Sequence, residues 1–287
     1  STQFTESVVG WCLEQLKNYE NLPTGPRKFS DILTAAAIAD PDVTLPMVYN
    51  FMRTPRSVER LLQVSAVLTA LKDPVSQSKQ AAYLLSYAKS TYPNLDPTLA
   101  EAMLQNRNET LLRFLLDALR DHRVPDATRE KGIIAAKVLK EKALDGLHLV
   151  LQTDDPEHDN VPRLNALDLI WDFVGIKGLS RALQALPATG TWWPTGVDFK
   201  NQVDEFCQNK LEPAKEEARP ILIQLIDDPN WVTRTYAMEC IIELYPQEAS
   251  ELLSSLADDD TALEGWIDGS VTTISSIVAS LSSDGNP

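Results

Sequence analysis

The sequence predicts an all-α protein, because its composition and its apolar periodicity both indicate that class. Hydrophobic residues make up 44% of the 287 residues and glycine only 11 positions. The chain therefore has ample core material but few residues suited to the positive φ angles of tight β turns. Apolar side chains recur every three or four residues, as in Leu61, Val64, Leu68 and Leu71, which is the spacing of one helix face. Strand-like alternation is scarce.

Short turns rich in Asp, Asn and Pro separate the apolar segments. Asp and Asn accept hydrogen bonds from the first amides of a helix, and proline is tolerated in the first turn of a helix but not in its interior. Each turn therefore indicates the end of one helix and the start of the next. The turns are LPTGP (22–26), ADPD (39–42), KDP (72–74), TYPNLDP (91–97), DHRVPD (121–126), TDDPEHDN (153–160), ALPATGTWWPTG (185–196) and DDPN (227–230).

Residues of the same kind recur after four of these turns. In each segment the turn is followed by an arginine early in the next helix, and in three of them by a small residue further along. The gaps between successive arginines are 69, 34 and 71 residues, which are two, one and two periods of about 35 residues. The arginines are Arg60, Arg129, Arg163 and Arg234, and the small residues include Gly132, Ala166 and Ala237.

This order and period resemble the HEAT repeat family, whose units carry an Asp in the turn between two helices and an Arg early in the second helix, and which grades into the armadillo repeats. Pro46 and Pro220 each precede a motif arginine by 14 residues, like the proline often found in the first helix of a HEAT unit. The resemblance covers residues 43–245, in four clear units and two interpolated ones.

The resemblance implies a right-handed α-solenoid of about six helix pairs, forming a single domain over residues 1–287. Residues 1–42 would form an N-terminal cap and residues 246–287 a C-terminal helical cap, because the ends of a stack must be covered. The turn Asp would cap the second helix, and the motif Arg would reach the Asp of a neighbouring unit. Small residues such as Gly132 would let helices approach closely.

The whole chain has a net charge of −15, and its acidic residues are concentrated in the second half. Residues 1–143 contain 18 Lys and Arg against 16 Asp and Glu, whereas residues 144–287 contain 8 against 25. Such a surface repels nucleic acid and anionic membranes and attracts a basic protein surface. Acidic helix surfaces also serve solubility, so the charge alone does not establish a partner.

No pattern typical of a catalytic, nucleotide-binding or metal site occurs. The sequence lacks GxSxG, GxxxxGK[ST], GxGxxG and HExxH, and the acidic turn 153–160 lacks the ligand order of a calcium loop. Cys12, Cys207 and Cys240 have no CxxC spacing, which fits a reducing, cytoplasmic setting. No apolar run reaches the roughly 20 residues of a membrane-spanning helix. We therefore expect no catalytic residue, cofactor, metal, bound nucleic acid or membrane insertion.

An acidic stripe is the first candidate for a partner-binding site. In HEAT solenoids the second helix of each unit lines the concave face, and carboxylates stand five and nine residues after two motif arginines. Positions i and i+4 share a helix face, so these side chains predict a surface for a Lys/Arg-rich segment of a protein partner. The residues are Asp168, Asp172, Asp204, Glu239 and Glu243, with Glu205 as the alternative to Asp204 in an interpolated unit.

Two adjacent tryptophans are the second candidate. Trp192 and Trp193 stand between Gly190 and Gly196 in a segment without helical periodicity. Exposed indoles are typical anchors of protein interfaces, but the same pair fits equally well as a plug between repeats.

Together these features favour a non-catalytic scaffold or adaptor that holds a protein partner on a concave face, acidic in the C-terminal half. The alternative is an enzyme with a HEAT-like frame and no recognisable motif, a lyase or isomerase acting on a bound cofactor. The His-Glu pairs of HEAT-like iron hydroxylases and the basic groove of HEAT-like DNA glycosylases are both missing. Six units are too few for a full-length importin-like receptor.

Overall fold

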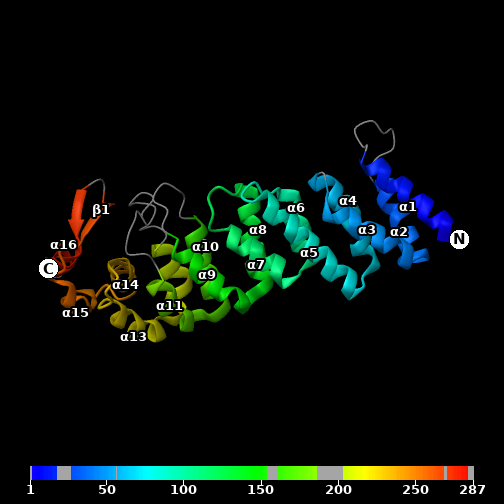
Figure 1. Ribbon diagram of the computed structural model, residues 1–287. Coiled ribbons are helices and arrows are strands. Elements are labelled where there is room, and N and C mark those ends of the chain that lie inside the picture. Colours follow the sequence, from blue (N-terminus) through cyan, green and yellow to red (C-terminus); the bar gives the residue numbers. More distant parts are fainter. Residues whose placement is uncertain are drawn as a thin grey trace. The chain divides into compact units, whose positions relative to one another are not determined.

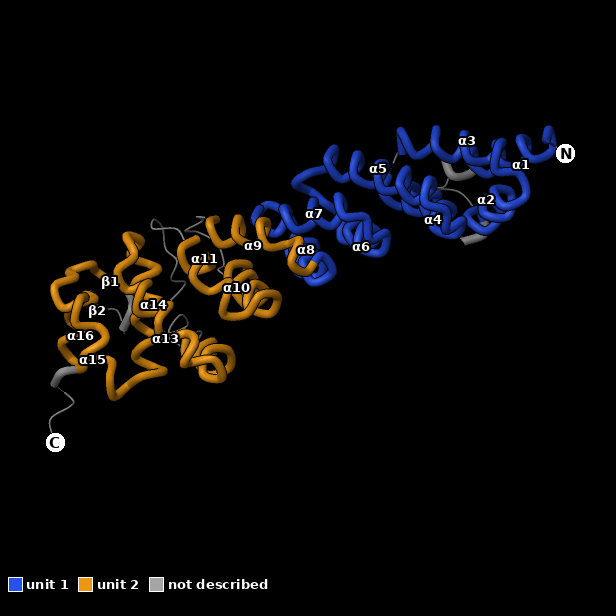
Figure 2. The backbone as a smooth tube through the Cα atoms, turned by 90° about the horizontal axis from the view of Figure 1, so that it is seen from below, with its two compact units in different colours: residues 1–139 blue, residues 140–287 orange. Residues whose placement is uncertain are grey.

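The computed structural model describes residues 2–17, 27–55, 57–153, 161–185, 203–267 and 270–283. These residues are mostly helical (Figure 1), as the sequence predicts. The contacts between residues divide the chain into two compact units, Ser1–Leu139 and Lys140–Pro287 (Figure 2). We describe each unit by itself.

Unit 1 contains eight helices in its described part. Proline occupies the first position of α3, α5 and α6, where its missing N–H costs nothing. The helices are α1 (Thr2–Lys17), α2 (Arg27–Ala39), α3 (Pro41–Arg53), α4 (Val58–Leu71), α5 (Pro74–Thr91), α6 (Pro97–Asn106), α7 (Glu109–Ala118) and α8 (Asp126–Leu139).

The aspartates before these prolines cap the helices, as the turn pattern predicts. The side chain of Asp40 accepts a hydrogen bond from the amide of Val43 at 3.3 Å. Asp73 accepts from two amides at 3.0 Å, and Asp96 accepts from one at 2.7 Å. Each cap satisfies amides that would otherwise lack a partner in the first turn, which explains why the Asp-Pro pairs set the helix boundaries.

The helices of unit 1 pack in two series. The odd-numbered helices contact one another in order, α1 with α3, α3 with α5 and α5 with α7. The even-numbered helices do the same, α2 with α4, α4 with α6 and α6 with α8. The two helices of one pair, such as α7 and α8, also pack against each other. Each helix pair of unit 1 thus contacts the next pair through both of its helices.

Gly132 permits the close approach of α7 and α8. A Cβ atom at this position would lie 2.6 Å from the carbonyl oxygen of Leu115 and 3.1 Å from the Cβ of Leu119, well inside contact distance. The core side of α7 is apolar and includes the buried residues Leu111, Leu112 and Leu115. A small residue at position 132 is therefore a packing requirement, as expected from the motif.

Unit 2 is also mainly helical but less regular. Its α-helices in the described part are α9 (Leu144–Leu151), α10 (Val161–Val174), α11 (Leu179–Gln184), α13 (Lys215–Leu225), α14 (Trp231–Leu244), α15 (Ala249–Leu252) and α16 (Ile274–Ser283). Short 3-10 helices are η2 (Lys140–Ala143), η3 (Gly175–Gly178), η5 (Glu212–Ala214) and η6 (Ser254–Leu256), and η4 (Cys207–Leu211) is a π-helix.

The segment 203–211 lies between α10 and α14 and holds the core of unit 2 together. The Phe206 ring lies 5.7 Å from the ring of Trp171 on α10 and 6.1 Å from that of Tyr236 on α14, edge to face in both cases. Edge-to-face rings add about 0.5–1.5 kcal/mol each beyond the area that they bury. This aromatic contact fixes the position of η4, which carries part of the candidate site.

The end of the chain differs from the expected helical cap. Strands β1 (Ala262–Ile267) and β2 (Ser270–Thr273) form an antiparallel hairpin in which Leu263 pairs with Thr272. β-Branched residues such as those of the Val-Thr-Thr run of β2 favour strands over helices. Helix α16 begins at Ile274. Thr273 and Ser276 cap its start, because the hydroxyl oxygen of each accepts a hydrogen bond from the backbone amide of the other. A short β-branched run thus forms a strand within residues 246–287, for which we expected a helical cap.

Candidate partner-binding site

Two predicted acidic residues, Asp168 and Asp172, lie one turn apart on α10 and face a lysine that the sequence pattern did not reveal. The Nζ of Lys210, from η4, donates a hydrogen bond to Oδ1 of Asp172 at 2.7 Å. Burial raises the pKa of Asp168, and the negative charges of Asp172 and Glu205 raise it further. The positive charge of Lys210 acts in the opposite direction and lowers this pKa. Asp168 therefore lies within electrostatic reach of two further carboxylates and of the Lys210 ammonium group.

A small pocket opens beside this acidic cluster, which we define as Asp168, Asp172 and Glu205. Its volume is about 160 Å³, enough for one cationic head group. Asp168, Glu205 and Lys210 form the charged part of the lining. The apolar walls are Leu164, Leu167, Phe206 and Tyr236.

The remaining predicted acidic residues do not extend the cluster as an open stripe. Glu239 is only 4% exposed, because α14 is buried on nearly every side. Glu243 accepts a hydrogen bond from Nε2 of Gln208 at 3.0 Å, and Asp204 is half-buried with an interaction of its own. Of the two alternatives in the interpolated unit, Glu205 is the one beside Asp168.

The sequence did not predict the contact of Lys210 with Asp172, because η4 is a π-helix. In a π-helix the hydrogen bonds join residues five positions apart in the chain, one more than in an α-helix, so an α-helical register misaligns the residues after Phe206. A regular α-helical spacing does not predict that Lys210 lies near Asp172. The other predicted candidates, Trp192 and Trp193, lie outside the described residues.

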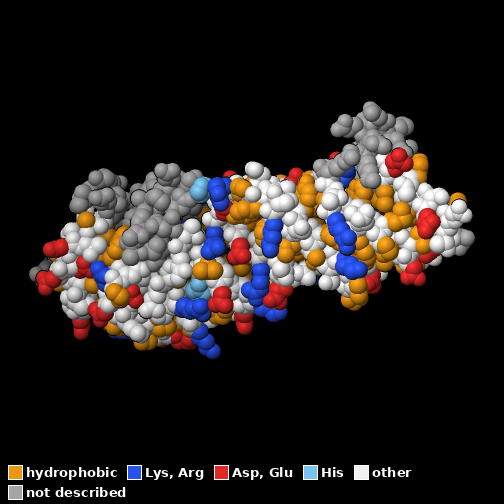
Figure 3. Space-filling view, in the orientation of Figure 1, with side chains coloured by type: hydrophobic (Ala, Val, Ile, Leu, Met, Phe, Trp, Pro, Cys, Tyr) orange, Lys and Arg blue, Asp and Glu red, His pale blue; other side chains and the backbone are white. Residues whose placement is uncertain are grey.

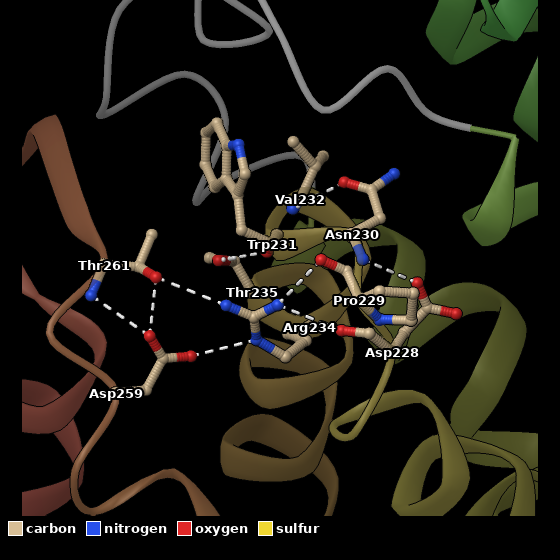
Figure 4. Close-up of polar contacts among 9 residues, drawn as sticks. All are labelled: Asp228, Pro229, Asn230, Trp231, Val232, Arg234, Thr235, Asp259 and Thr261. Carbon is tan, nitrogen blue, oxygen red and sulfur yellow. Dashed lines mark hydrogen bonds and ion pairs between the residues drawn. The ribbon is translucent and has the colours of Figure 1, made fainter.

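The motif arginine Arg234 connects two turns of unit 2 (Figure 4). Its Nε donates to Oδ2 of Asp259 at 2.9 Å, and Nη1 donates to the carbonyl oxygens of Asp228 and Pro229 at 3.0 and 3.1 Å. Nη2 donates to Oγ1 of Thr261 at 3.2 Å. Burial acts to raise the pKa of Asp259, but hydrogen bonds from Thr261 and Arg234 outweigh it and lower the pKa. One guanidinium thus ties its own turn to a later aspartate, as the motif implies.

The other motif arginines are arranged differently in the described part of the chain. Arg129 pairs with Asp126 of its own helix at 2.7 Å, and Arg163 is 4% exposed. The backbone amide of Arg60 donates a hydrogen bond to Oγ of Ser57, which caps α4. Most of the turn 153–160, which follows Arg129 in the repeat, lies outside the described residues.

A threonine before the motif arginine makes the same contact in both units, which the sequence analysis did not anticipate. Oγ1 of Thr128 donates to the carbonyl oxygen of Leu95 at 2.7 Å, and Oγ1 of Thr233 donates to that of Leu183 at 2.8 Å. Both threonines are fully buried. In unit 1 the acceptor lies in the turn before α6, 33 residues earlier, and in unit 2 it lies in the last turn of α11, 50 residues earlier.

Unit 1 has a larger groove of about 730 Å³, formed by α4, α5, α6 and α8. Gln80 organises its floor, because its Nε2 donates to Oγ of Ser65 and Oγ1 of Thr69 while its Oε1 accepts from Asn106. The ion pair of Lys131 with Glu101, at 2.8 Å, borders it. On the face shown in Figure 3, lysine and arginine side chains occur over the helices of unit 1, in contrast to the acidic balance of the second half.

No family model, curated protein or solved structure matches this chain. Within the residues that the structure describes, no helix is both long and apolar enough to cross a membrane. The same residues contain no group of three or more His, Cys, Asp or Glu side chains placed to hold a metal ion. The site therefore has to be interpreted from its own geometry.

Proposed function

We propose that the chain is a HEAT-like, right-handed α-solenoid of about six helix pairs that acts as a non-catalytic scaffold and holds a protein partner through a Lys/Arg-rich segment. The observation that carries this proposal is the acidic cluster of Asp168, Asp172 and Glu205, for which Lys210 is the one cation found among the described residues. One lysine cannot neutralise three carboxylates. The cluster therefore retains negative charge that a cationic side chain of a partner can match.

Three features support the repeated helix-pair architecture in this proposal. Successive pairs in unit 1 contact each other through both helices. Asp side chains cap α3, α5 and α6, and side chains of the preceding turn also cap the motif helices α4 and α14, where Ser57 and Asn230 stand in place of the expected Asp. The contacts of Thr128 and Thr233 occur one residue before motif arginines in both units. In a repeat, residues at the same position of each unit have similar surroundings, and the two buried threonines fit this expectation in that each donates to a backbone carbonyl.

The pocket beside the cluster suits a long cationic side chain. A Lys or Arg of the partner would direct its charged end toward Asp168 and Glu205 and lay its methylene groups against Leu164 and Leu167. Hydrogen bonds to charged groups contribute about 1.5–3 kcal/mol each. Asp168 and Glu205 are exposed, so salt should screen their attraction for a cation. One anchoring residue of this kind gives selectivity for basic segments.

Fluorescence anisotropy with a labelled Lys/Arg-rich peptide tests the proposal. We expect the variant Asp168→Asn/Asp172→Asn/Glu205→Gln to bind at least about tenfold more weakly than the wild type, since about 1.4 kcal/mol corresponds to a factor of ten. Wild-type affinity should fall as salt is raised to about 0.5 M.

A control variant removes acidic charge elsewhere in unit 2. Glu251→Gln/Asp258→Asn changes two exposed carboxylates that take no part in the cluster, and it should alter affinity less than about twofold by long-range charge alone. Equal losses in the two variants would indicate a nonspecific effect of net charge. Undiminished binding by the cluster variant would contradict the proposal.

A further inference from the structure

The groove of unit 1 differs in chemistry from the acidic cluster and plays no part in the proposed binding of a basic segment. Its lining residues come from α4, α6 and α8, with two more from α5, and α6 contacts both α4 and α8. The axes of packed helices lie about 8–10 Å apart, so a groove that crosses three of them extends for about 16–20 Å. An extended polypeptide rises about 3.3 Å per residue, and about five or six residues therefore span the groove.

The charged side chains of the groove are mostly compensated. Lys131 on α8 and Glu101 on α6 pair with each other at 2.8 Å. The hydrogen bond from Lys131 lowers the pKa of Glu101, so both members of the pair are charged at neutral pH. Among the described residues of the lining, Glu130 is the remaining charged one, and it is exposed, where salt screens it. The lining therefore complements an uncharged ligand better than an ion.

Gln80 holds the polar floor of the groove in a fixed arrangement. The residue is only 5% exposed. Its Nε2 donates to Oγ of Ser65 at 2.6 Å and to Oγ1 of Thr69 at 2.7 Å, and its Oε1 accepts from Nδ2 of Asn106 at 2.8 Å. These bonds connect α4, α5 and α6. The polar groups are thus oriented before a ligand binds, which reduces the entropy cost of binding.

The amides beside Gln80 retain hydrogen-bonding capacity of both kinds. Nδ2 of Asn106 donates to Gln80 and to the carbonyl oxygen of Gln77, which uses both of its hydrogens and leaves Oδ1 as an acceptor. Gln105 donates one hydrogen to Glu101 and keeps a second N–H and its Oε1. The side chain of Gln77 makes no hydrogen bond to the described residues, and both glutamines are exposed. A polypeptide main chain offers one donor and one acceptor per residue, which side-chain amides complement.

We propose that the groove of unit 1 binds an uncharged, extended segment of a protein partner, about five or six residues long, mainly through the main chain of that segment. Gln77, Gln105 and Asn106 would form hydrogen bonds with its N–H and C=O groups. Its side chains would pack against Ala66 and Ala102, which also line the groove. This site does not depend on the acidic cluster of unit 2.

Two hexapeptides with the sequence Thr-Ala-Ser-Ala-Thr-Ala, acetylated and amidated at their ends, test the proposal. In one of them, alternate main-chain nitrogens carry a methyl group, which removes N–H donors and leaves the side chains in place. Isothermal titration calorimetry on the full chain should show the unmethylated peptide binding at least about tenfold more tightly, since each lost hydrogen bond leaves an acceptor of the groove without its donor.

Variants of the groove locate the binding. Gln77→Ala/Gln105→Ala should weaken the unmethylated peptide by at least about fivefold. The control Gln3→Ala/Asn50→Ala removes two exposed amides of α1 and α3 that do not line the groove, and it should change the affinity less than about twofold. Ala66→Trp should fill the groove and abolish binding. Ala66 is exposed, so this variant should fold, which circular dichroism checks.

Several results would overturn the proposal. They are no binding of the unmethylated peptide at about 1 mM, equal affinity for the two peptides, unchanged affinity in Gln77→Ala/Gln105→Ala, or full affinity in a folded Ala66→Trp variant. Binding of the neutral peptide should also stay constant within about twofold as salt rises to about 0.5 M, whereas binding of a basic peptide at the acidic cluster should weaken. The two sites are therefore tested independently.

Discussion

Arg234 shows how one side chain of the repeat motif contributes to stability. Its guanidinium donates four hydrogen bonds, to two backbone carbonyls, a carboxylate and a hydroxyl, which a lysine cannot reproduce because it lacks the planar fork. The exposed fractions of the Arg234 and Asp259 side chains are 17% and 16%, so solvent screens their attraction only partly.

We expect Arg234→Lys to lower the free energy of unfolding by about 1–3 kcal/mol, because part-buried acceptors lose their donors. Arg219→Lys is the control, since Arg219 pairs with Glu248 on an exposed surface, and it should cost less than about 1 kcal/mol. Urea unfolding followed by circular dichroism measures both. Similar losses in the two variants would show that Arg234 is an ordinary surface arginine.

Asp121 gives unit 1 a defined dependence on pH. The Arg123 guanidinium, followed by the hydroxyl of Tyr92 at 2.5 Å, lowers the pKa of Asp121 well below its usual range. A depressed folded-state pKa adds stability that is fully present above the unfolded-state pKa of about 3.9 and is lost as the pH falls toward the folded-state pKa.

Asp121→Asn should therefore lower the melting temperature at neutral pH, and the difference from the wild type should shrink as the pH falls below about 4. Thermal melts at several pH values check this. A difference that stays constant down to the lowest accessible pH would contradict the assignment. Asp117→Asn, a change of an exposed carboxylate on α7, is the matched control.

At the scale of single elements, the contact between α7 and α8 depends on Gly132. The Cβ of an alanine there would meet a backbone oxygen, which cannot move without displacing the helix. Gly10 in α1 is the natural comparison, because a Cβ there would meet only the flexible end of Met47 at 3.9 Å.

Gly132→Ala should lower the melting temperature, whereas Gly10→Ala should raise it through the better helix propensity of alanine, about 0.5–1 kcal/mol. Differential scanning calorimetry distinguishes the two signs. If both substitutions stabilised the protein, the packing of α7 on α8 would be looser than described.

Helix boundaries were predictable where the chemistry is local. Asp73 and Asp96 precede prolines and cap the following helices, and the sequence alone contains that information. The hairpin of β1 and β2 was not predictable, because its short strands gain stability from pairing with each other. The position of Lys210 depends on the π-helical turn of η4, for which the sequence offers no comparable signal.

For the whole molecule, the sequence predicted the helical class and the acidic second half, since both follow from composition and periodicity. It placed Asp168 and Asp172 on one helix face, and the structure brings them beside Glu205 and Lys210. It did not anticipate that Glu239 is buried, because burial of α14 on nearly all sides depends on contacts between segments distant in the sequence. Side-chain type predicts charge, whereas packing decides which charges a partner can reach.

The affinity of a Lys/Arg-rich peptide for the variant Lys210→Ala tests the proposed function most directly. Removal of the resident cation leaves Asp168, Asp172 and Glu205 uncompensated, so a cationic partner should bind more tightly, by about threefold to tenfold for roughly 0.7–1.4 kcal/mol of lost competition. Lys215→Ala, which removes a lysine outside the cluster, should change affinity much less. Unchanged or weaker binding by Lys210→Ala would show that the acidic cluster is an internal ion pair and not the binding site of a basic segment.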